Sequence, residues 1–249
     1  MKHRVAVISG ASSGIGLYTA RLLAARGAKV ALLARRKDVL EQAVSEIRAA
    51  GGEALALTVD VTDQASVDAA AAAVEQAYGP ANLVFNNAGI MLPGAIEERK
   101  VGEWEQQIDL NITGAMRVIA AFVPQLTRSA KLGATADLIN TSSIAGQNIY
   151  PYFAVYSATK AYVSHLTRHL RVELGPKKVR VSMIEPGITA TELQGHVTFQ
   201  GAKDWLAGAE EAMDFLQPQD IAEVVAFLAD QPKHVNLQQV VVMPTGQAT

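Results

Sequence analysis

The segment Val5-Ala-Val-Ile-Ser-Gly-Ala-Ser-Ser-Gly-Ile-Gly16 is the strongest indicator of the fold class, because a short apolar run passes directly into a turn of glycines and serines. Residues 5–9 predict a buried strand, and residues 15–26 show helical periodicity that ends near Gly27. Small residues in such a turn allow backbone amides and the helix N-terminus to approach a pyrophosphate. No Lys-Ser or Lys-Thr pair follows Gly16, so the turn is not a P-loop. The turn predicts a dinucleotide-binding site. The alternative is that its glycines only allow the backbone conformation of the turn.

The same unit of strand and helix recurs along the chain. Further strands are predicted at residues 29–34, 54–59, 83–85, 136–141, 179–184 and 239–243, and helices at 38–50, 64–78, 101–128, 155–174 and 218–229. Residues 185–217 are expected to be irregular. No linker or second core interrupts the pattern, so residues 1–249 are expected to form one domain.

This alternation predicts an α/β, Rossmann-type doubly wound parallel sheet with helices on both faces. Ligands of such sheets bind beyond the carboxyl ends of the strands. Gly10, residues 86–89, Ser143 and the Pro186-Gly187 pair all follow predicted strands, so they are expected to line one crevice.

Composition limits the partners and the compartment. Hydrophobic residues make up 49% and charged residues 18% of the 249 positions, as expected for a sheet covered on both faces and for helices buried between subunits. The net charge of −2 and the lack of a basic block argue against nucleic acid as a partner. The chain has no cysteine, which excludes disulfides and thiolate catalysis. No apolar segment has the length of a signal-peptide core or a membrane span, so a cytoplasmic protein is expected.

Tyr156 and Lys160 lie one helical turn apart, so their side chains share a face of the predicted helix. A free tyrosine has a pKa of about 10 and is a poor acid–base catalyst at neutral pH. A fixed cation favours the phenolate, and lowering the pKa by about three units requires about 4 kcal/mol of differential stabilisation. The pair predicts proton transfer to or from oxygen. The alternative, a solvated pair on an amphipathic helix, does not account for the other motifs in their order.

Together the motifs resemble the short-chain dehydrogenase/reductase family, of the classical type, over essentially the whole chain. The resemblance rests on the following motifs, in the order and approximate spacing that the family uses: Gly10-x-x-x-Gly14-x-Gly16, Asp60-Val61, Asn86-Asn-Ala-Gly89, Asn111, Ser143, Tyr156-x-x-x-Lys160 and Pro186-Gly187. It implies an enzyme that transfers a hydride between a nicotinamide cofactor and a carbonyl or alcohol.

The resemblance implies catalytic roles for four residues. Tyr156 is expected to donate a proton to a carbonyl oxygen, or to accept one in the reverse direction. Lys160 is expected to hold the nicotinamide ribose and to depress the tyrosine pKa. Family spacing selects Ser143 over Ser142 as the residue that bonds the substrate oxygen, and Asn111 would support a water that connects Lys160 to solvent.

The turn after the second predicted strand indicates the cofactor. An acid there would accept hydrogen bonds from a ribose 2′-hydroxyl, whereas an arginine pairs with a 2′-phosphate. The strand ends at Ala34 and is followed by Arg35 and Arg36, so charge-assisted pairing favours NADP over NAD. The alternative is a solvated basic turn.

Further cofactor contacts are implied by the resemblance. Asp60 would contact the adenine amino group, Val61 the adenine ring, and Thr191 the carboxamide or a phosphate. The remaining expected cofactor-binding residues are Gly10, Ser12, Ser13, Gly14, Ile15, Gly16, Asn87, Ala88, Gly89, Tyr156, Lys160, Pro186, Gly187 and Ile188.

Residues 190–217 carry apolar side chains among glycines and polar residues, and we expect them to form a lid over the substrate. Trp205 and Phe215 can equally be core anchors of two short helices. Tyr150 and Tyr152 have no lysine four residues on, so they are expected to line the mouth of the substrate pocket.

Three functions are compatible with these motifs. The first is NADP-dependent reduction of a ketone or aldehyde to an alcohol. The C-terminal ending and residues 191–196 are similar to a subgroup with NADP-dependent 3-hydroxy acid (serine-type) dehydrogenases and the clavulanate-forming aldehyde reductase. The second candidate is therefore a dehydrogenase whose substrate carboxylate would meet His196 or Lys203, and activity that requires a carboxylate would distinguish it. The third is a non-catalytic NADP-binding regulator.

No metal is expected, because His165 and His169 lie one turn apart but nothing supplies a third ligand. The resemblance also implies assembly into a homodimer or homotetramer through the helices that begin near Trp104 and Val155.

Overall fold

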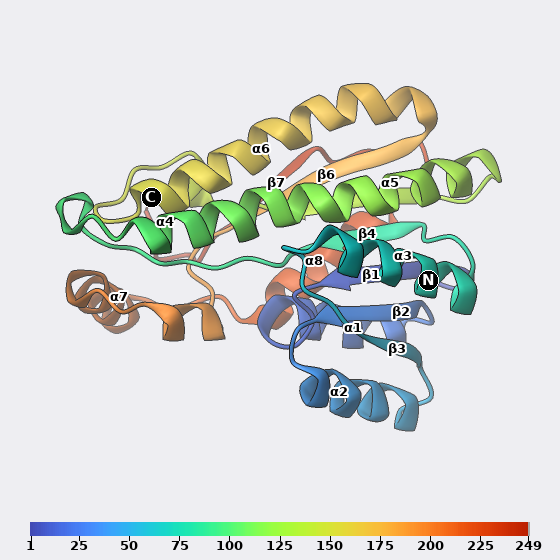
Figure 1. Cartoon of the computed structure of the whole chain (residues 1–249), viewed down its shortest axis with the longest axis horizontal. Coiled ribbons are helices and arrows are strands. Elements are labelled where there is room, and N and C mark those ends of the chain that lie inside the picture. Colours follow the sequence, from blue (N-terminus) through green and yellow to red (C-terminus); the bar gives the residue numbers. More distant parts are fainter. Residues whose placement is uncertain (249) are drawn as a thin grey trace.

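Seven parallel strands form one sheet, in the order β3-β2-β1-β4-β5-β6-β7, in a computed structural model that describes residues 1–248 (Figure 1). The strands are β1 Val5–Ser9, β2 Lys29–Ala34, β3 Glu53–Thr58, β4 Leu83–Asn86, β5 Ala136–Thr141, β6 Val179–Pro186 and β7 Gln239–Val242. The chain leaves β1 toward one edge and returns at β4 toward the other, so the doubly wound sheet predicted from the sequence is confirmed.

Helices cover both faces of the sheet (Figure 1). On one face lie α1 Gly14–Ala25, α2 Lys37–Ala49 and α8 Pro218–Asp230, whose Leu23, Leu40 and Ile221 are fully buried. On the other lie α3 Gln64–Tyr78, α5 Ala115–Lys131 and α6 Ala154–Leu174, which bury Val67, Phe122 and Leu174. Within residues 1–248, no helix is both long and apolar enough to cross a membrane.

The helix predicted over residues 101–128 is divided by a wider turn. It consists of α4 Val101–Ile108, a π-helical turn over Asp109–Gly114, and α5. Such π-turns are rare and occur frequently at functional sites. Here the turn contains Asn111, which is 2% exposed and directed into the protein.

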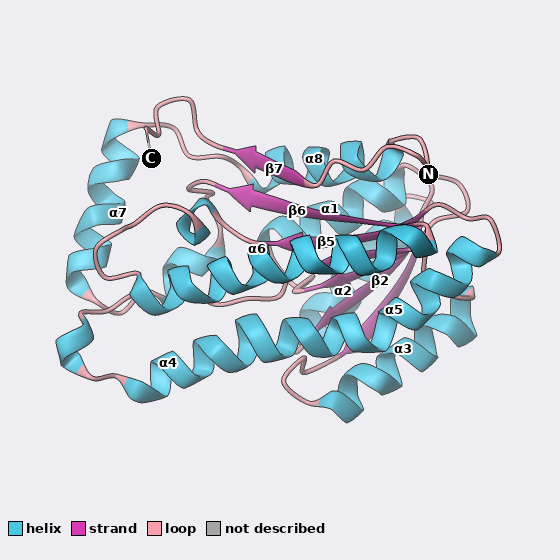
Figure 2. Cartoon of the chain, turned by 90° about the horizontal axis from the view of Figure 1, so that it is seen from above, coloured by secondary structure: helices cyan, strands magenta, loops and turns pink. Residues whose placement is uncertain are grey.

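The prediction of an irregular segment over residues 185–217 was wrong, because it contains the helix α7 Gln200–Ala212 and the short 3₁₀ turn η5 Glu192–His196. Gly201 and Gly208 interrupt the helical pattern of α7, and among its residues Ala202 alone is fully buried, so the apolar periodicity is weak. Figure 2 shows α7 beyond the carboxyl ends of the strands, apart from the two helical layers. A bridge between Thr189 and Leu216 joins the two ends of this segment.

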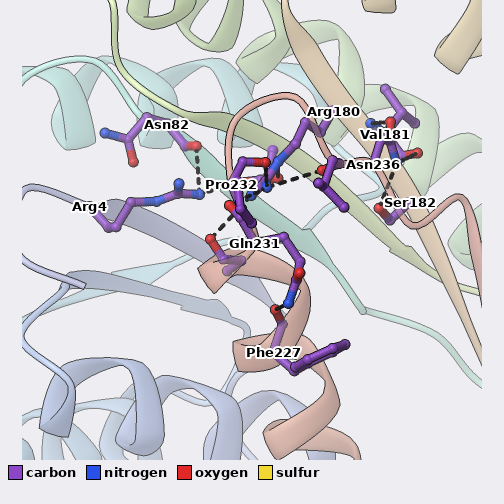
Figure 3. Close-up of polar contacts among 12 residues, drawn as sticks. Arg4, Asn82, Arg180, Val181, Ser182, Phe227, Gln231, Pro232 and Asn236 are labelled. Atoms are coloured by element: carbon purple, nitrogen blue, oxygen red, sulfur yellow. Dashed lines mark hydrogen bonds and ion pairs between the residues drawn. The ribbon is translucent and has the colours of Figure 1, made fainter.

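A buried charged cluster joins β1, β5 and β6. The Asp137 carboxylate accepts hydrogen bonds from Arg4 and, at 2.6 Å, from Nε of Arg180. Arg4 also donates to the backbone oxygen of Asn82, and Arg180 donates to the backbone oxygen of Gln231, just beyond α8 (Figure 3). All three charged side chains are less than a tenth exposed. Asp137 therefore compensates two guanidinium groups that have little access to water.

Replacing Asp137 with alanine should lower the free energy of unfolding by about 3–5 kcal/mol, because both buried guanidinium groups lose their counter-ion. Denaturant titration measures the change. The control is Glu46→Ala, which removes an exposed ion pair with Arg21 and should change stability by about 1 kcal/mol or less. Equal losses in the two variants would contradict the role of Asp137.

Candidate active site

A cleft of about 410 Å³ lies at the carboxyl ends of the strands, around the neighbouring strands β1 and β4, after which the chain runs to opposite edges of the sheet. Nearly all the residues predicted to bind cofactor or catalyse line it. The two exceptions, Gly16 and Asn111, stand behind its wall. Residues that contribute to the lining are Gly10, Ser12, Ser13, Gly14, Ile15, Arg35, Arg36, Asp60, Val61, Asn87, Ala88, Gly89, Ser143, Tyr156, Lys160, Pro186, Gly187, Ile188 and Thr191.

The turn between β1 and α1 forms a tight backbone cradle. A Cβ atom on Gly16 would lie 2.3 Å from the backbone oxygen of Gly10, and one on Gly10 would lie 2.9 Å from Cα of Ala88. Gly10 and Gly14 also have positive φ angles of 66° and 48°, which L side chains rarely adopt. These glycines keep the N-terminus of α1 open on the cleft side. The cradle therefore fits the pyrophosphate of a dinucleotide.

A chain of buried polar side chains ties the cradle to the rest of the sheet. The Ser9 hydroxyl donates to Oδ1 of Asn86 and accepts from the backbone N–H groups of Asn87 and Ala88 at 2.9 and 3.1 Å. Asn86 donates to Asn140 on β5. Asn140 in turn donates to Thr167 on α6 at 3.0 Å. Strands β1, β4 and β5 and helix α6 are thus held in register behind the cleft lining.

Tyr156 lies near the start of α6, is 7% exposed, and forms a hydrogen bond with Ser143. Burial raises the pKa of Tyr156 to about 12, and the hydrogen bond with Ser143 offsets only part of this rise. The expectation that the pKa is depressed therefore does not hold for this arrangement. The phenol is protonated at neutral pH.

Lys160 lies one turn after Tyr156 and is 6% exposed. Its Nζ donates to the backbone oxygen of Thr141 at 3.1 Å and is 5.7 Å from the centroid of the tyrosine ring. Burial lowers the pKa of Lys160 to about 8. The ammonium group is thus near the phenol but does not overcome the effect of burial on it.

The two adjacent serines point in different directions. Ser143 is the N-cap of a 3₁₀ turn, with its Oγ accepting from the backbone of Ala145, and it bonds Tyr156. Ser142 instead donates to the backbone oxygen of Lys160 at 2.9 Å and contacts Ser164 at 2.7 Å. Ser143 therefore faces the cleft beside Tyr156, and Ser142 holds α6 through the Lys160 carbonyl and Ser164.

Asn111 clamps the loop after β4 against α6. Its side-chain amide accepts from the Ile90 N–H and donates to the Ile90 carbonyl, and Nδ2 also lies 3.1 Å from Oγ1 of Thr159. A Cβ atom on Gly89 would lie 3.2 Å from Oδ1 of Asn111 and 3.6 Å from Nζ of Lys160. The π-turn thus brings Asn111 behind the same stretch of loop that Lys160 faces.

At the other end of the cleft, Arg35 and Arg36 follow β2 and are exposed. Arg36 donates to the Ser12 hydroxyl at 2.9 Å and pairs with Glu192 at 2.8 Å. Asp60 also lines this end, where hydrogen bonds from Thr62 and the charge of Arg35 hold its pKa below the usual range. Two guanidinium groups and an ionised carboxylate therefore surround this part of the cleft.

Thr191 stands beside the cradle and caps the next turn. Its Oγ1 donates to Gln194 at 3.1 Å and accepts from the backbone of Leu193 at 3.3 Å. A Cβ atom on Gly14 would lie 3.3 Å from Cγ2 of Thr191. Thr191 thus caps the 3₁₀ turn that follows it and also contacts the glycine-rich turn.

The wall beside Tyr156 is aromatic and comes from distant segments. The Trp205 ring on α7 lies 5.7 Å from Tyr150 and 5.6 Å from Phe153. Tyr152 does not line the cleft and packs on Phe199 at 4.8 Å. Lining residues outside the predicted site residues and the predicted lid are Leu33, Ala34, Val59, Ile90, Met91, Leu110, Thr141, Ser142, Ile144, Phe153, Thr189 and Gln247. Glu192, Leu193, Gln194 and Leu206 come from residues 190–217, the segment expected to form a lid. Phe153 lies directly before α6, and no motif in the sequence marks it as a lining residue.

Replacing Lys160 with methionine should change how stability depends on pH. The folded-state pKa of Lys160, about 8, is below the ordinary value of 10.5, so the unfolded chain binds more protons between these pH values. Wild-type stability should therefore rise relative to the variant by up to about 3 kcal/mol as pH increases through this window.

Denaturant titration of both proteins from pH 7 to 10.5 measures this difference, and groups common to both proteins cancel. Below pH 8 the difference should be constant. A difference that stays flat through pH 10.5 would contradict the burial of a charged Lys160.

Comparison with known proteins identifies the family. Residues 4–200 match the model of the short chain dehydrogenase family. An uncharacterized oxidoreductase of Listeria monocytogenes is 38% identical over 249 residues, which cover 99% of this chain and 98% of that protein. The closed form of a serine dehydrogenase complexed with NADP+ superposes with a TM-score of 0.90 at 28% identity, covering 98% of this chain and 96% of that chain.

A 3-ketoacyl-(acyl-carrier-protein) reductase from Brucella melitensis, complexed with NADH, has a TM-score of 0.85 and 32% identity, covering 97% of each chain. The cleft geometry, the family match and these relatives agree on the class of protein. The chain belongs to the classical short-chain dehydrogenase/reductase family and is an NAD(P)-binding oxidoreductase.

Proposed function

We propose that this protein is an NADP(H)-dependent oxidoreductase that reversibly reduces a ketone or aldehyde to an alcohol. The observation that carries the proposal is the buried Tyr156 phenol, bonded to Ser143 and followed one turn later by Lys160. A pure NADP-binding regulator has no need of such a proton-transfer set, so this observation favours an enzyme over a binding module.

Reduction of a carbonyl requires a proton for its oxygen and a hydride for its carbon. The hydride is the chemistry that the nicotinamide supplies when it is bound. Tyr156 would donate its phenolic proton to the substrate oxygen, while the Ser143 hydroxyl holds that oxygen in place. Because an alkoxide is a stronger base than a phenolate, a phenol with a pKa of about 12 still transfers its proton downhill. The raised pKa also keeps the donor protonated, which suits the reductive direction.

Lys160 would orient the cofactor and return a proton to Tyr156 after the reaction. An ammonium group has three N–H donors, and the bond to Thr141 uses one of them. The other two can bond the hydroxyls of the nicotinamide ribose. Asn111, which is held against Ile90 and Thr159, would support the water that carries protons from solvent to Lys160.

The preference for NADP rests on Arg35 and Arg36. No acid stands at the end of β2 to accept hydrogen bonds from a 2′-hydroxyl, and the two guanidinium groups line the cleft beside the cradle. The similar structures do not decide the question, since the serine dehydrogenase is complexed with NADP+ and the Brucella reductase with NADH. The charge of this chain's own residues favours a 2′-phosphate.

The substrate end of the cleft favours an uncharged carbonyl compound. Its walls are apolar or aromatic, with Met91, Phe153, Leu193 and Trp205 among them. A ligand in such a site gains from burial of its own apolar surface, whereas a carboxylate needs a paired cation.

A 3-hydroxy acid dehydrogenase remains the second candidate function. The closed serine dehydrogenase has a TM-score of 0.90 to this chain, and His196 lines the cleft where a substrate carboxylate could meet it. Lys203, the other cation considered from the sequence, is not among the lining residues.

We also propose assembly through α4, α5 and α6. Ile108 and Met116 are 45% and 44% exposed, and the hydroxyl of Tyr162 on α6 donates to Sδ of Met116 at 2.9 Å. These side chains form an apolar surface across neighbouring helices, which fits the homodimer or homotetramer expected from the family.

Tyr156→Phe should lower kcat at least about 100-fold, because the substrate oxygen loses its proton donor. The dissociation constant for NADPH should stay within about two-fold of the wild-type value. Steady-state rates with a panel of aldehydes and ketones, together with nicotinamide fluorescence, measure the two effects. Tyr18→Phe removes a hydroxyl from α1, outside the cleft lining, and is the control. A Tyr156→Phe enzyme with wild-type kcat would overturn the assignment of the proton donor.

Replacing Arg35 and Arg36 together with alanine should raise the dissociation constant for NADPH at least about ten-fold, because charge-assisted hydrogen bonds to the phosphate are lost. NADH, which lacks the 2′-phosphate, should change less than about two-fold. Parallel fluorescence titrations give both constants. Lys37→Ala removes a neighbouring exposed cation that pairs with Glu41, and it is the matched control. Equal losses for NADPH and NADH would mean that the arginines do not recognise the phosphate.

A further inference from the structure

Glu192 brings a carboxylate to the guanidinium group that the 2′-phosphate would use. Its Oε2 lies 2.8 Å from Nη2 of Arg36, and its side chain also bonds Ser13. Arg36 donates in addition to the Ser12 hydroxyl at 2.9 Å. These four side chains come from three separate segments and close a ring over the glycine-rich turn.

The backbone around Glu192 holds the carboxylate over that turn. Glu192 is the first residue of η5, directly after the capping residue Thr191, whose methyl group rests against Gly14. The hydrogen bond from Arg36, followed by the one from Ser13, keeps the pKa of Glu192 below its usual range. Glu192 is therefore ionised at neutral pH and stands at the entrance to the phosphate-binding end of the cleft.

Folding stability does not explain this ion pair. The Glu192 and Arg36 side chains are 56% and 48% exposed, and exposed pairs of this kind contribute little to stability. The pair does lie in the lining of the cleft, where both residues would face a bound ligand. The charges of this pair therefore affect mainly the binding of ligands in the cleft.

We propose that Glu192 is a specificity-determining residue for the cofactor, because its carboxylate holds the phosphate-binding position on Arg36 and a 2′-phosphate must displace it. The inference rests on the proposed preference for NADP. A phosphate and a carboxylate compete for the same guanidinium fork. NADH has no 2′-phosphate and leaves the pair in place. Glu192 thus weakens NADP(H) binding relative to NAD(H) and moderates the preference that Arg35 and Arg36 create.

The position of Glu192 also connects the two ends of the cleft. The same short turn carries Leu193 and His196, which line the substrate end. Glu192 is the first residue of this turn. A ligand that displaces its carboxylate therefore contacts the start of a segment that also lines the substrate end of the cleft.

The experiment compares two ligands that differ only in the 2′-phosphate: adenosine 2′,5′-bisphosphate and adenosine 5′-monophosphate. Isothermal titration calorimetry at low ionic strength, where screening of exposed charges is weak, gives the dissociation constants without any enzymatic reaction. Glu192→Gln keeps the shape of the side chain and removes its charge. The bisphosphate should bind this variant about five-fold more tightly than the wild type, and the monophosphate should change less than two-fold.

Two further variants control the measurement. Glu211→Gln makes the same change of charge on the exposed end of α7, outside the cleft lining, and should alter neither constant. In an Arg36→Ala background, Glu192→Gln should no longer strengthen binding of the bisphosphate, because the competition takes place on Arg36.

The results separate this inference from the proposed function. If Arg36→Ala weakens the bisphosphate but Glu192→Gln does not strengthen it, the role of Glu192 is wrong and the NADP preference stands. Equal tightening of both ligands by Glu192→Gln, or tightening that persists without Arg36, would likewise overturn the inference. If Arg36→Ala leaves binding of the bisphosphate unaffected, the proposed recognition of the phosphate by Arg36 fails.

Discussion

The hydrogen bonds of the fully buried Ser9 hydroxyl are the interaction on which the rest of the site depends. This hydroxyl joins the end of β1 to the end of β4, the two neighbouring strands after which the chain runs to opposite edges of the sheet. The connection continues through Asn86 and Asn140 to Thr167 on α6. A buried polar chain of this kind is stable only if each member finds its partner, so it tolerates a single register of the strands. That register sets the glycine-rich cradle and helix α6 at fixed positions on one cleft.

Burial has opposite effects on the two titratable groups at the reacting end. The phenol of Tyr156 becomes a weaker acid and the ammonium of Lys160 a stronger one, so both neutral forms are favoured. An argument from sequence spacing treats Lys160 only as a nearby positive charge, and it omits the loss of water around both groups. In the structure, this loss of water shifts the two pKa values more than the interaction between the two groups does. The site is thus better suited to hold a proton on Tyr156 than to remove one, which fits a donor to a carbonyl oxygen.

Charge divides the cleft into two parts with different chemistry. Arg35, Arg36, Asp60 and Glu192 gather near the cradle, whereas aromatic and aliphatic side chains surround Tyr156. Residues 191–196 extend from one part to the other, and the helix α7 adds Trp205 to the apolar wall. An anionic cofactor and an uncharged substrate would therefore meet surfaces matched to each, along one continuous segment of chain.

The order of strands and helices, the doubly wound class of the sheet and the candidate residues at the strand ends all follow from the amino-acid pattern. Those signals are local: apolar periodicity and glycines in turns follow from neighbouring residues and steric rules. Seven strands and most helices were predicted within one or two residues, while α7 was missed because its apolar face is narrow and two glycines interrupt it.

Tertiary structure alone decided how the pieces of the site meet. The pairing of Arg36 with Glu192 joins residues 156 positions apart, and the contact between Trp205 and Phe153 joins two separate helical segments. The π-turn that directs Asn111 inward and the burial that moves the pKa values of Tyr156 and Lys160 also depend on packing from several elements at once. These effects depend on distances between residues far apart in the sequence and on the exclusion of water. Neither can be read from a short stretch of sequence.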